Sequence, residues 1–382
     1  MNKLKLALIG CGRIADNHLR AALANYRDIE VVALCDVIEG KAAMEKLGYQ
    51  IFVHEKDLPV NLGEIIHPEK INMYSDYKIM LRQEDIDICA IATESGYHAE
   101  IALYCLNHNK KHVIVEKPMA MSIRDANKMI QTAKENNLKL AVCHQNRFNK
   151  TIQKLRQAVN EGRFGRIFAG TAKILWNRNK EYYDKGNWRG TYKLDGGCLL
   201  NQCTHNIDLL QWMMGSGIDS VYGQIGNYLH SYIQAEDYGS IIIRFSNGAI
   251  GNIEGTVNVY PKNLEETLAV LGEKGTAVIG GLALNKILVW DFEDKRDSLE
   301  QVKKECDSED GNIYGEGHAP LYRDFVSAIR NNSTPLIDGN EGVKTLSIIL
   351  MAYKSQKDSR AIKYSEGLDI RSGDFEGMLN GS

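Results

Sequence analysis

The chain of 382 residues lacks the features that mark several classes of protein. No apolar run approaches the roughly 18 residues that a membrane-spanning helix needs, so we expect no membrane partner. The formal net charge is −3, which gives no electrostatic reason to expect a nucleic acid as a partner. Only 6 prolines occur, which argues against a proline-rich, low-complexity chain. What remains is a globular protein that is long enough for two domains with separate cores.

The 8 cysteines also lack the spacing of a metal or redox motif, because no two of them form a Cys-x-x-Cys pair. Cys198 and Cys203 lie on a predicted helix, where a spacing of five residues should turn them to different sides. Cys203 and His205 lack companions at ligand spacing, so no metal is predicted. The first predicted strand starts within a few residues of Met1, which leaves no room for a signal peptide. We therefore expect a cytoplasmic protein with reduced thiols.

A glycine-rich turn near the start of the chain predicts a dinucleotide-binding fold. The apolar strand Leu4–Ile9 leads into Gly10-Cys11-Gly12-Arg13-Ile14-Ala15, and a helix is expected from Ile14 to about Tyr26. In this motif the first glycine allows the tight turn, the second lets the backbone approach a pyrophosphate, and a small third residue lets the helix pack on the strand. The alternative is a helix N-terminus that binds no ligand. We predict cofactor contacts at Gly10, Gly12, Arg13 and Ile14.

An acidic residue after the second strand indicates which cofactor binds. The strand Glu30–Cys35 ends at Asp36, roughly 20 residues past the glycines, where an acidic side chain holds the hydroxyls of the adenosine ribose. A carboxylate here would repel the 2′-phosphate of NADP. Val37 and Ile38 follow, and no arginine stands beside the acid to bind that phosphate, although Lys41 is near. The sequence therefore predicts NAD, with NADP less favoured.

A single lysine follows a buried strand where this kind of fold carries out its chemistry. The segment Val113–Val115 is apolar and β-prone, and it runs directly into Glu116-Lys117-Pro118. In an open α/β sheet, ligands bind beyond the carboxyl ends of the strands, so Lys117 would meet substrate and cofactor there. The alternative is a solvated lysine in a loop. The glycine-rich turn earlier in the chain favours the catalytic interpretation.

The order of the predicted elements divides the chain into two domains. Residues 1–148 alternate strands and helices, which predicts a Rossmann-type, doubly wound parallel sheet of the α/β class. A polar stretch at about 50–72 interrupts the alternation and is interpreted as an insertion. Residues 149–382 predict an α+β domain with an open, mostly antiparallel sheet for substrate binding and oligomerisation. The final helices, 321–331 and 340–357, are expected to pack back on the first domain. Strands of the second domain are expected at 167–175, 220–227, 240–245, 249–259, 267–271 and 277–279.

A polar stripe on an otherwise apolar helix supplies a candidate base. The segment Gly196–Gly215 has a glycine at each end, and Asn201, His205 and Asp208 fall at i, i+4 and i+7 on one face of the predicted helix. A histidine held between an amide and an acid has its tautomer and direction fixed, as a general base for an alcohol requires. The alternative is a structural histidine that bonds to its helix neighbours.

These motifs together resemble the glucose–fructose oxidoreductase and inositol dehydrogenase (Gfo/Idh/MocA) family of nicotinamide-dependent sugar oxidoreductases. The resemblance covers almost the whole chain. It rests on the motifs named above, on Thr93 with His98, and on the closing segment 335–342. It implies that Lys117 and His205 form the catalytic pair. Asn201 stands where many members carry an aspartate, and it would orient the substrate hydroxyl or the histidine.

Further segments are similar to dehydrogenases that oxidise C3 of UDP-N-acetylglucosaminuronic acid, namely His144–Asn149, Trp188–Thr191 and Leu194–Gly197. Arg147 and Arg189 would match a carboxylate or a diphosphate, and ordinary ion pairing is the alternative. The resemblance implies cofactor contacts from Thr93, His98, Glu116, Lys117, Gln145, Trp188 and Arg189. It implies substrate contacts from Asn146, Arg147, Asn201 and Asp208.

The sequence thus predicts an NAD-dependent enzyme that oxidises a ring hydroxyl of a sugar or nucleotide sugar to a ketone. His205 would take the hydroxyl proton, and Lys117 would stabilise the negative charge that develops on the same oxygen. The alternatives are an inositol or free-sugar dehydrogenase of the same family, and a non-catalytic NAD-binding sensor. We expect a homodimer or homotetramer through the C-terminal sheet, because helices can cover only one face of an open sheet.

Overall fold

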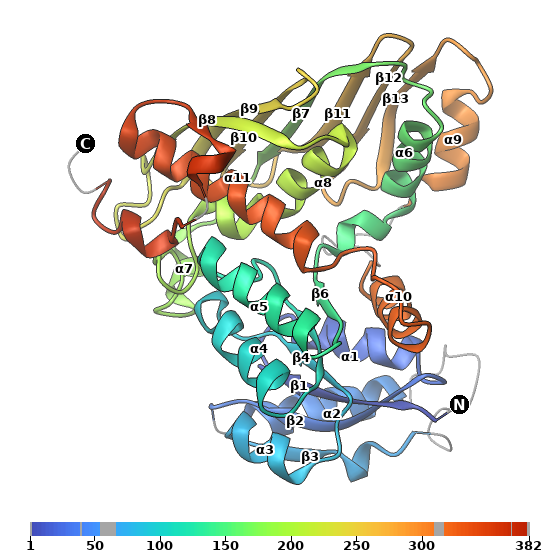
Figure 1. The fold of residues 1–382 in the computed structure, drawn as a ribbon, viewed down its shortest axis with the longest axis vertical. Helices are drawn as coiled ribbons and strands as arrows, with labels where there is room; N and C mark the ends of the chain where they lie inside the picture. Colours follow the sequence, from blue (N-terminus) through green and yellow to red (C-terminus); the bar gives the residue numbers. More distant parts are fainter. Residues whose placement is uncertain (1, 39, 54–65, 309–316, 368, 380–382) are drawn as a thin grey trace. The chain divides into compact units, whose positions relative to one another are not determined.

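The computed structural model describes residues 2–379 except 39, 54–65, 309–316 and 368 (Figure 1). The chain forms two compact units. Unit 1 comprises residues 1–120, 125–143 and 318–341, and unit 2 comprises residues 121–124, 144–317 and 342–382. Most of the predicted insertion at 50–72 lies outside the described residues.

Unit 1 is built on a six-stranded sheet in which all neighbouring strands are parallel. The strand order β3-β2-β1-β4-β5-β6 is that of a dinucleotide-binding fold. The central strands are almost entirely apolar because helices cover both faces of such a sheet. The predicted doubly wound parallel sheet is therefore confirmed. Its strands are β1 (Leu4–Ile9), β2 (Ile29–Cys35), β3 (Asn72–Tyr74), β4 (Ile88–Ile91), β5 (His112–Val115) and β6 (Leu140–Val142).

The helices of unit 1 include one that comes from the C-terminal part of the chain. They are α1 (Ala15–Ala24), α2 (Lys41–Val53), α3 (Tyr77–Gln83), α4 (His98–Asn107), α5 (Ile123–Glu135) and α10 (His318–Arg330). α10 packs against α1, as expected for a returning helix. The last helix, α11 (Gly339–Asp358), instead belongs to unit 2 from residue 342 onward, which corrects the expectation for it. The reason is a close fit to the second sheet, where Gln356 accepts a hydrogen bond from the amide of Ile225 and Ala352 lies against Gly223.

Unit 2 contains an eight-stranded sheet with the order β13-β12-β11-β7-β10-β9-β8-β14. Only the pair of β7 and β10 is parallel among its neighbouring strands, so the predicted mostly antiparallel sheet is confirmed. The prediction missed β13 and the helix α9 (Leu299–Cys306) that follows it, although Ile287–Trp290 is β-prone. The strands are β7 (Ile167–Leu175), β8 (Ile218–Gly226), β9 (Tyr238–Phe245), β10 (Ile250–Thr256), β11 (Glu265–Gly272), β12 (Gly275–Gly280), β13 (Lys286–Phe292) and β14 (Ile362–Lys363).

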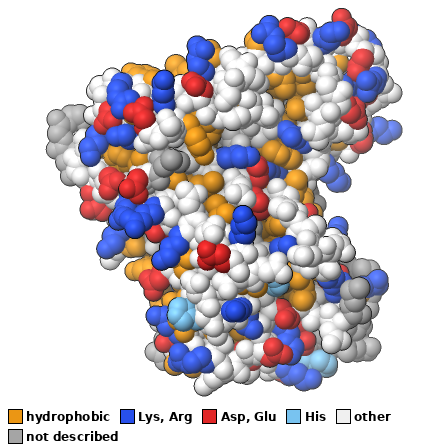
Figure 2. Space-filling model, in the orientation of Figure 1, with side chains coloured by type: hydrophobic (Ala, Val, Ile, Leu, Met, Phe, Trp, Pro, Cys, Tyr) orange, Lys and Arg blue, Asp and Glu red, His pale blue; other side chains and the backbone are white. Residues whose placement is uncertain are grey.

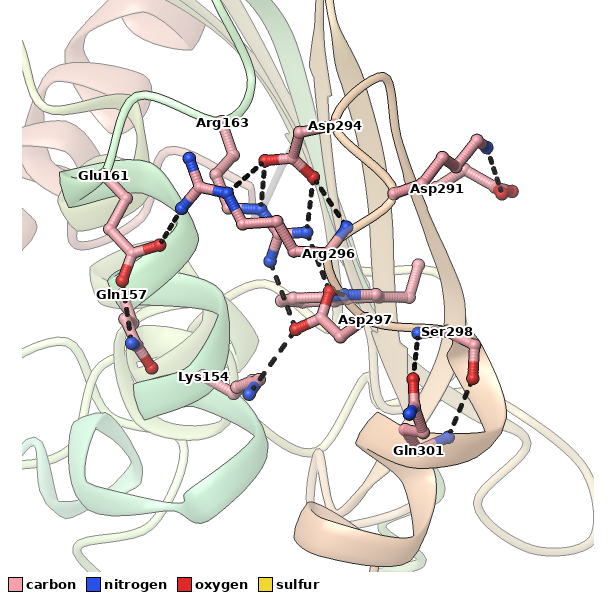
Figure 3. Close-up of polar contacts among 12 residues, drawn as sticks. Lys154, Gln157, Glu161, Arg163, Asp291, Asp294, Arg296, Asp297, Ser298 and Gln301 are labelled. Carbon is pink, nitrogen blue, oxygen red and sulfur yellow. Dashed lines mark hydrogen bonds and ion pairs between the residues drawn. The ribbon is translucent and has the colours of Figure 1, made fainter.

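Besides α11, helices α6 (Lys150–Asn160) and α8 (Thr204–Met214) pack on this sheet, and α8 carries His205 and Asp208. Helix α8 packs across β7, β10 and β11, and α6 packs on β12 (Figure 1). An ion-pair network joins the end of α6 to the loop after β13 (Figure 3). In it, the nearly buried Arg163 lies 2.9 Å from an oxygen of Asp294 and 2.7 Å from one of Asp297. This network joins the segment after α6 to the loop after the edge strand β13.

Charged side chains of both signs are interspersed on the face of the molecule that Figure 2 shows. That face therefore carries no large patch of one sign, which agrees with the small net charge. Among the described residues, no helix is long and apolar enough to cross a membrane.

Candidate active site

The glycine-rich turn after β1 leaves room for a dinucleotide. Gly10 has φ +97°, and a Cβ atom there would lie 2.5 Å from the carbonyl carbon of Ala92, so only glycine fits. A Cβ atom at Gly12 would meet nothing within 4 Å, so the backbone faces open space at this position. Helix α1 begins at Ala15, and its N-terminal amides follow directly after the turn. The turn therefore fits a pyrophosphate group.

Asp36 lies beside this turn at the end of β2. Its Oδ2 accepts a hydrogen bond of 2.8 Å from the backbone amide of Cys11, and its Oδ1 accepts one of 2.8 Å from that of Ile38. These two bonds fix the carboxylate between the turn and the end of the strand. The position fits an acceptor for ribose hydroxyls next to a phosphate site, as NAD requires.

Lys117 follows β5 between two anchored neighbours. Glu116 is 7% exposed, and its Oε2 accepts a hydrogen bond of 3.1 Å from the backbone amide of Lys117. Pro118 is joined to Lys117 by a cis peptide bond, and its carbonyl oxygen lies 2.8 Å from Nδ1 of His98. The lysine side chain therefore extends from a backbone that is held on both sides.

The buried ring of His98 links the ends of two neighbouring strands. Its Nε2 lies 3.0 Å from the carbonyl oxygen of Thr93, which follows β4, and its Nδ1 faces Pro118. Burial lowers the pKa of His98, which favours the neutral ring. A neutral ring has one N–H group, so it donates to one of these two carbonyl oxygens. Both ring nitrogens face backbone oxygens of unit 1. This placement does not support the predicted direct cofactor contact from His98 and gives the ring a structural role.

In unit 2, the predicted helix from Gly196 to Gly215 consists of two segments. Residues Cys198–Gln202 form a turn of π-helix, and α8 begins after Cys203. Because a π-helix aligns residues that are five apart, Sγ of Cys198 lies 3.5 Å from Sγ of Cys203. The prediction that these thiols face different sides was wrong for this reason. The change of register also means that Asn201 does not precede His205 by one regular α-helical turn.

Asp208 and Arg147 bind each other in the interior of unit 2. Both are 0% exposed, and Nε and Nη2 of Arg147 each donate a hydrogen bond of 2.7 Å to the carboxylate. Thr345 donates a further bond of 3.0 Å to Asp208. Burial would raise the pKa of Asp208, but the charges of Arg147 and His144 and these hydrogen bonds outweigh it and lower the pKa. Direct substrate contacts from Arg147 and Asp208 are not supported, because a contact needs exposed atoms.

His205 lies on α8, one turn before Asp208, and its side chain is half-buried. Its ring meets that of His144 edge-on, with centroids 5.9 Å apart. Nε2 of His144 lies 4.0 Å from Oδ1 of Asp208. A buried carboxylate, a buried histidine and a partly exposed histidine thus form a row. In this row His144 and Asp208 are buried, whereas the side chain of His205 remains partly exposed.

Asn201 is part of a chain of hydrogen bonds at the π-helical turn. Its Nδ2 donates to Asp195, and its Oδ1 accepts a bond of 2.7 Å from Gln202. Gln202 accepts a bond of 2.9 Å from Nε of Arg178 and donates one of 2.9 Å to the hydroxyl of Tyr182. The network fixes the direction of the Asn201 amide and joins it to a guanidinium group.

Two half-buried arginines beside this network stack on aromatic rings. The guanidinium carbon of Arg178 lies 4.6 Å from the ring of Trp176, and that of Arg189 lies 4.4 Å from the rings of both Tyr182 and Trp188. Within the described part of the chain, Arg189 forms no ion pair with an acidic residue. The alternative that Arg189 serves in an ordinary ion pair therefore finds no support. The predicted contacts Gln145 and Asn146, by contrast, are only 2% and 6% exposed, in the turn η4 (Gln145–Phe148).

The predicted site residues did not include Arg178, Asp195 and Gln202 of these networks, nor His18 and His318. Asp195 directly precedes Gly196-Gly197, so its closeness to a recognised motif was an available signal. His18 and His318 both lie beside Glu116. No local pattern could join these two, because they come from opposite ends of the chain.

Comparisons with known proteins agree with this geometry. Residues 4–144 match the family described as "Oxidoreductase family, NAD-binding Rossmann fold", and residues 152–278 match the "GFO/IDH/MocA C-terminal domain". The WlbA dehydrogenase of Bordetella pertussis, solved in complex with NADH and UDP-GlcNAcA, is 33% identical, with a TM-score of 0.84 over 95% of this chain and 98% of that chain. The WlbA enzyme of Chromobacterium violaceum, in complex with the same two ligands, is 34% identical, with a TM-score of 0.82 over 95% and 96%. Myo-inositol 2-dehydrogenase of Thermotoga maritima is 22% identical over 377 residues, which is 95% of this chain and 99% of that protein.

Proposed function

Because the chain belongs to the GFO/IDH/MocA family of oxidoreductases with an NAD-binding Rossmann fold, we propose that it oxidises a ring hydroxyl of a UDP-linked sugar acid with NAD. The observation that carries the proposal is the presence of Lys117 at the end of β5 together with an accessible, supported His205 on α8. The likeness to two dehydrogenases that bind NADH and UDP-GlcNAcA supports the choice of substrate.

The proposed mechanism assigns one task to each side chain. Gly10, Gly12 and Asp36 would hold NAD, which would supply the acceptor for a hydride from the carbinol carbon of the sugar. Lys117 donates a hydrogen bond to the hydroxyl oxygen and stabilises the negative charge that develops there. Neutral His205 accepts the hydroxyl proton, and Asn201 orients the substrate. The anchored backbone around Lys117 fixes the position from which its side chain extends.

The stacked arginines support an anionic substrate. Guanidinium groups match carboxylates and phosphates through paired hydrogen bonds, and aromatic rings hold them in place without neutralising their charge. Arg189 has this environment, and its Nη1 donates to the hydroxyl of Tyr182, which Gln202 joins to Asn201. A free inositol has no charge for this guanidinium group to bind. This difference favours a UDP-linked sugar acid over the inositol alternative.

The exposed face of the eight-stranded sheet supports association of two or more copies. Residues paired across the strands form a row on this face that contains Tyr222, Ile242, Asn252, Thr171, Ala269 and Val278. Tyr222 is 39% exposed and Ile242 is 48% exposed. Small and apolar side chains in such a row suit a flat contact with a second copy. A wild-type monomer by light scattering at micromolar concentration would contradict this part of the proposal.

A substrate panel tests the function. The purified protein at micromolar concentration is mixed with NAD and, separately, with UDP-N-acetylglucosaminuronic acid, UDP-N-acetylglucosamine, myo-inositol and levoglucosan, and the absorbance of NADH is followed. High protein concentration makes a single turnover visible even where the cofactor is not released. We expect the UDP-linked acid to give the highest kcat/KM, with UDP-N-acetylglucosamine, which lacks the carboxylate, well below it. Preference for myo-inositol would replace the substrate, and NAD binding without turnover of any sugar would favour the sensor.

A further inference from the structure

Three histidines lie in the interior of unit 1 around the segment Glu116–Pro118. The proposed reaction does not use these histidines. His18 comes from α1, His98 begins α4, and His318 begins α10. They are 0%, 1% and 4% exposed. Buried polar groups are retained in a core when polar partners satisfy them, so the partners indicate what these rings do.

Two of the three histidines face the same oxygen of Glu116. Nε2 of His18 lies 3.3 Å from Oε1, and Nε2 of His318 lies 3.5 Å from it. The hydroxyl of Tyr322 lies 2.7 Å from Nδ1 of His18. When that hydroxyl donates to Nδ1, the ring carries its proton on Nε2, which faces the carboxylate. One tautomer therefore accounts for the contacts of both His18 nitrogens.

These contacts keep Glu116 ionised inside the protein. Burial alone would raise the pKa of Glu116, but the contacts from His18 and His318 outweigh burial and hold the pKa well below its ordinary value. Burial also lowers the pKa of His318, so this ring is a neutral donor at pH 7. The carboxylate thus remains a strong acceptor, and its other oxygen binds the backbone amide of Lys117 at 3.1 Å.

On the other side of the lysine, His98 performs the same task through a carbonyl group. Its Nδ1 lies 2.8 Å from the carbonyl oxygen of Pro118, and its Nε2 lies 3.0 Å from that of Thr93. The neutral tautomer with its proton on Nδ1 donates to Pro118, the residue after Lys117. The backbone before Lys117 is held by two histidines through a carboxylate. The backbone after it is held by the third.

We propose that His18, His98 and His318 are positioning residues that fix the place of Lys117 through Glu116 and Pro118. The inference rests on the proposed role of Lys117 in stabilising the developing negative charge. A catalytic group displaced by roughly 1 Å can lose about 100-fold in rate, so a lysine on a strand-to-helix loop needs such support. The contribution of α10 also gives a reason why a C-terminal helix returns to the nucleotide-binding unit.

The composition of this cluster also suits a metal ion, which makes metal content part of the test. The possible ligand atoms of His18, Glu116 and Cys143 lie within 4.8 Å of one another. We favour direct polar contacts because the hydroxyl of Tyr322 lies 2.7 Å from Nδ1 of His18, and Nε2 of the same ring lies 3.3 Å from Oε1 of Glu116.

The experiment compares substitutions that keep or remove the donor. His318→Gln retains an N–H group near the position of Nε2, whereas His318→Leu removes it, and Glu116→Gln removes the charge at nearly constant volume. We expect kcat with the preferred sugar of the panel to fall about 10- to 100-fold in His318→Leu and Glu116→Gln. We expect kcat of His318→Gln to stay within about threefold of wild type. The NAD dissociation constant, measured by NADH fluorescence, should change less than about threefold in both His318 variants. Thermal unfolding confirms that each variant is folded at the assay temperature, and Glu116→Gln carries the test if His318→Leu is not.

The outcomes separate this proposal from the proposed function. A wild-type rate in Lys117→Ala removes the role of the lysine, whatever the histidines do. An inactive Lys117→Ala together with wild-type kcat in Glu116→Gln and His318→Leu would overturn the positioning role alone. Equal losses of kcat in His318→Gln and His318→Leu would also count against it, because the donor would then not matter. If the purified protein contained one equivalent of a transition metal and Glu116→Gln lost it, the cluster would be a metal site and the positioning role would be overturned.

Discussion

Two of the buried glutamates, one chosen from each unit, differ in charge state: one is ionised and the other is protonated. Glu116 in unit 1 and Glu266 in unit 2 are 7% and 3% exposed, and burial raises the pKa of both. Contacts from two histidines hold the pKa of Glu116 well below its ordinary value. Glu266 accepts a hydrogen bond of 3.0 Å from Asn206, and its pKa rises to about 8. Because both side chains are buried, the difference follows from the kind of partner: two histidines face Glu116, whereas a neutral amide donates to Glu266.

The largest expected effect concerns Asp208, whose paired hydrogen bonds with Arg147 are the strongest contacts that keep it charged. Arg147→Met leaves the carboxylate buried beside an apolar side chain, and we expect the free energy of unfolding to fall by about 3–5 kcal/mol. Urea unfolding at pH 7 measures the loss. Arg156→Met is the matched control, because both guanidinium groups stack on Trp212, at 4.7 Å and 4.8 Å, while Arg156 leaves Asp208 paired. A similar loss in both variants would show that stacking, not the ion pair, stabilises this region.

The next largest effect concerns the cation that follows the ionised Glu116. Lys117→Ala should lower kcat by about 100-fold or more, because it removes the group that stabilises the developing negative charge, while NAD still binds. Steady-state kinetics with the preferred sugar, together with NADH fluorescence titration, separate the two effects. A near-normal kcat would remove the lysine from the mechanism.

His205 tests whether unit 2 supplies the base. His205→Asn should lower kcat by about 100-fold, because it removes the group that takes a proton near pH 7. Asn201→Asp should cost less and should move the rising limb of the pH–rate profile to higher pH, since an added carboxylate favours the protonated imidazole. The profile of kcat/KM against pH for wild type and both variants provides the measurement. If His205→Asn keeps the wild-type profile, the base lies elsewhere.

The smallest expected effect concerns Glu266, the buried acid whose pKa is raised to about 8. The pKa of Glu266 is about 8 in the folded protein against an ordinary 4.5, so the folded state holds the proton more tightly than the unfolded state does. The stability that this proton contributes is complete below about pH 4.5 and is lost as the pH rises through about 8. Glu266→Gln should therefore gain stability relative to wild type as the pH rises toward 9. Urea unfolding across this range checks it, with Glu265→Gln, on the other face of β11, as the control that should show no such gain.

The fold and the local motifs of unit 1 could be predicted from the sequence because each depends on neighbouring residues. Gly10, Asp36 and Lys117 all lie directly after an apolar strand, and strand ends meet at one edge of a parallel sheet. The supports of Lys117 could not be predicted, because His18 and His318 are brought together only by the packing of α10 on α1. A histidine on an apolar helix face gives no sign of such a distant partner.

In unit 2, a local irregularity defeated the periodicity argument. The stripe of Asn201, His205 and Asp208 assumed a regular α-helix from Gly196, whereas the π-helical turn changes the register before His205. Composition does not distinguish these two helices. The spacing placed Asp208 on the same face as His205, whereas the structure buries Asp208 against Arg147 and leaves His205 partly exposed.

The most direct test of the central claim follows the hydride. UDP-N-acetylglucosaminuronic acid that carries deuterium at C3 is incubated with the protein and NAD, and the reduced cofactor is analysed by mass spectrometry. Oxidation of the ring hydroxyl by hydride transfer predicts reduced cofactor that contains the deuterium, together with a keto sugar that has lost it. Reduced cofactor without deuterium would contradict oxidation at C3, and a bound sugar that yields no reduced cofactor at all would contradict the proposed function.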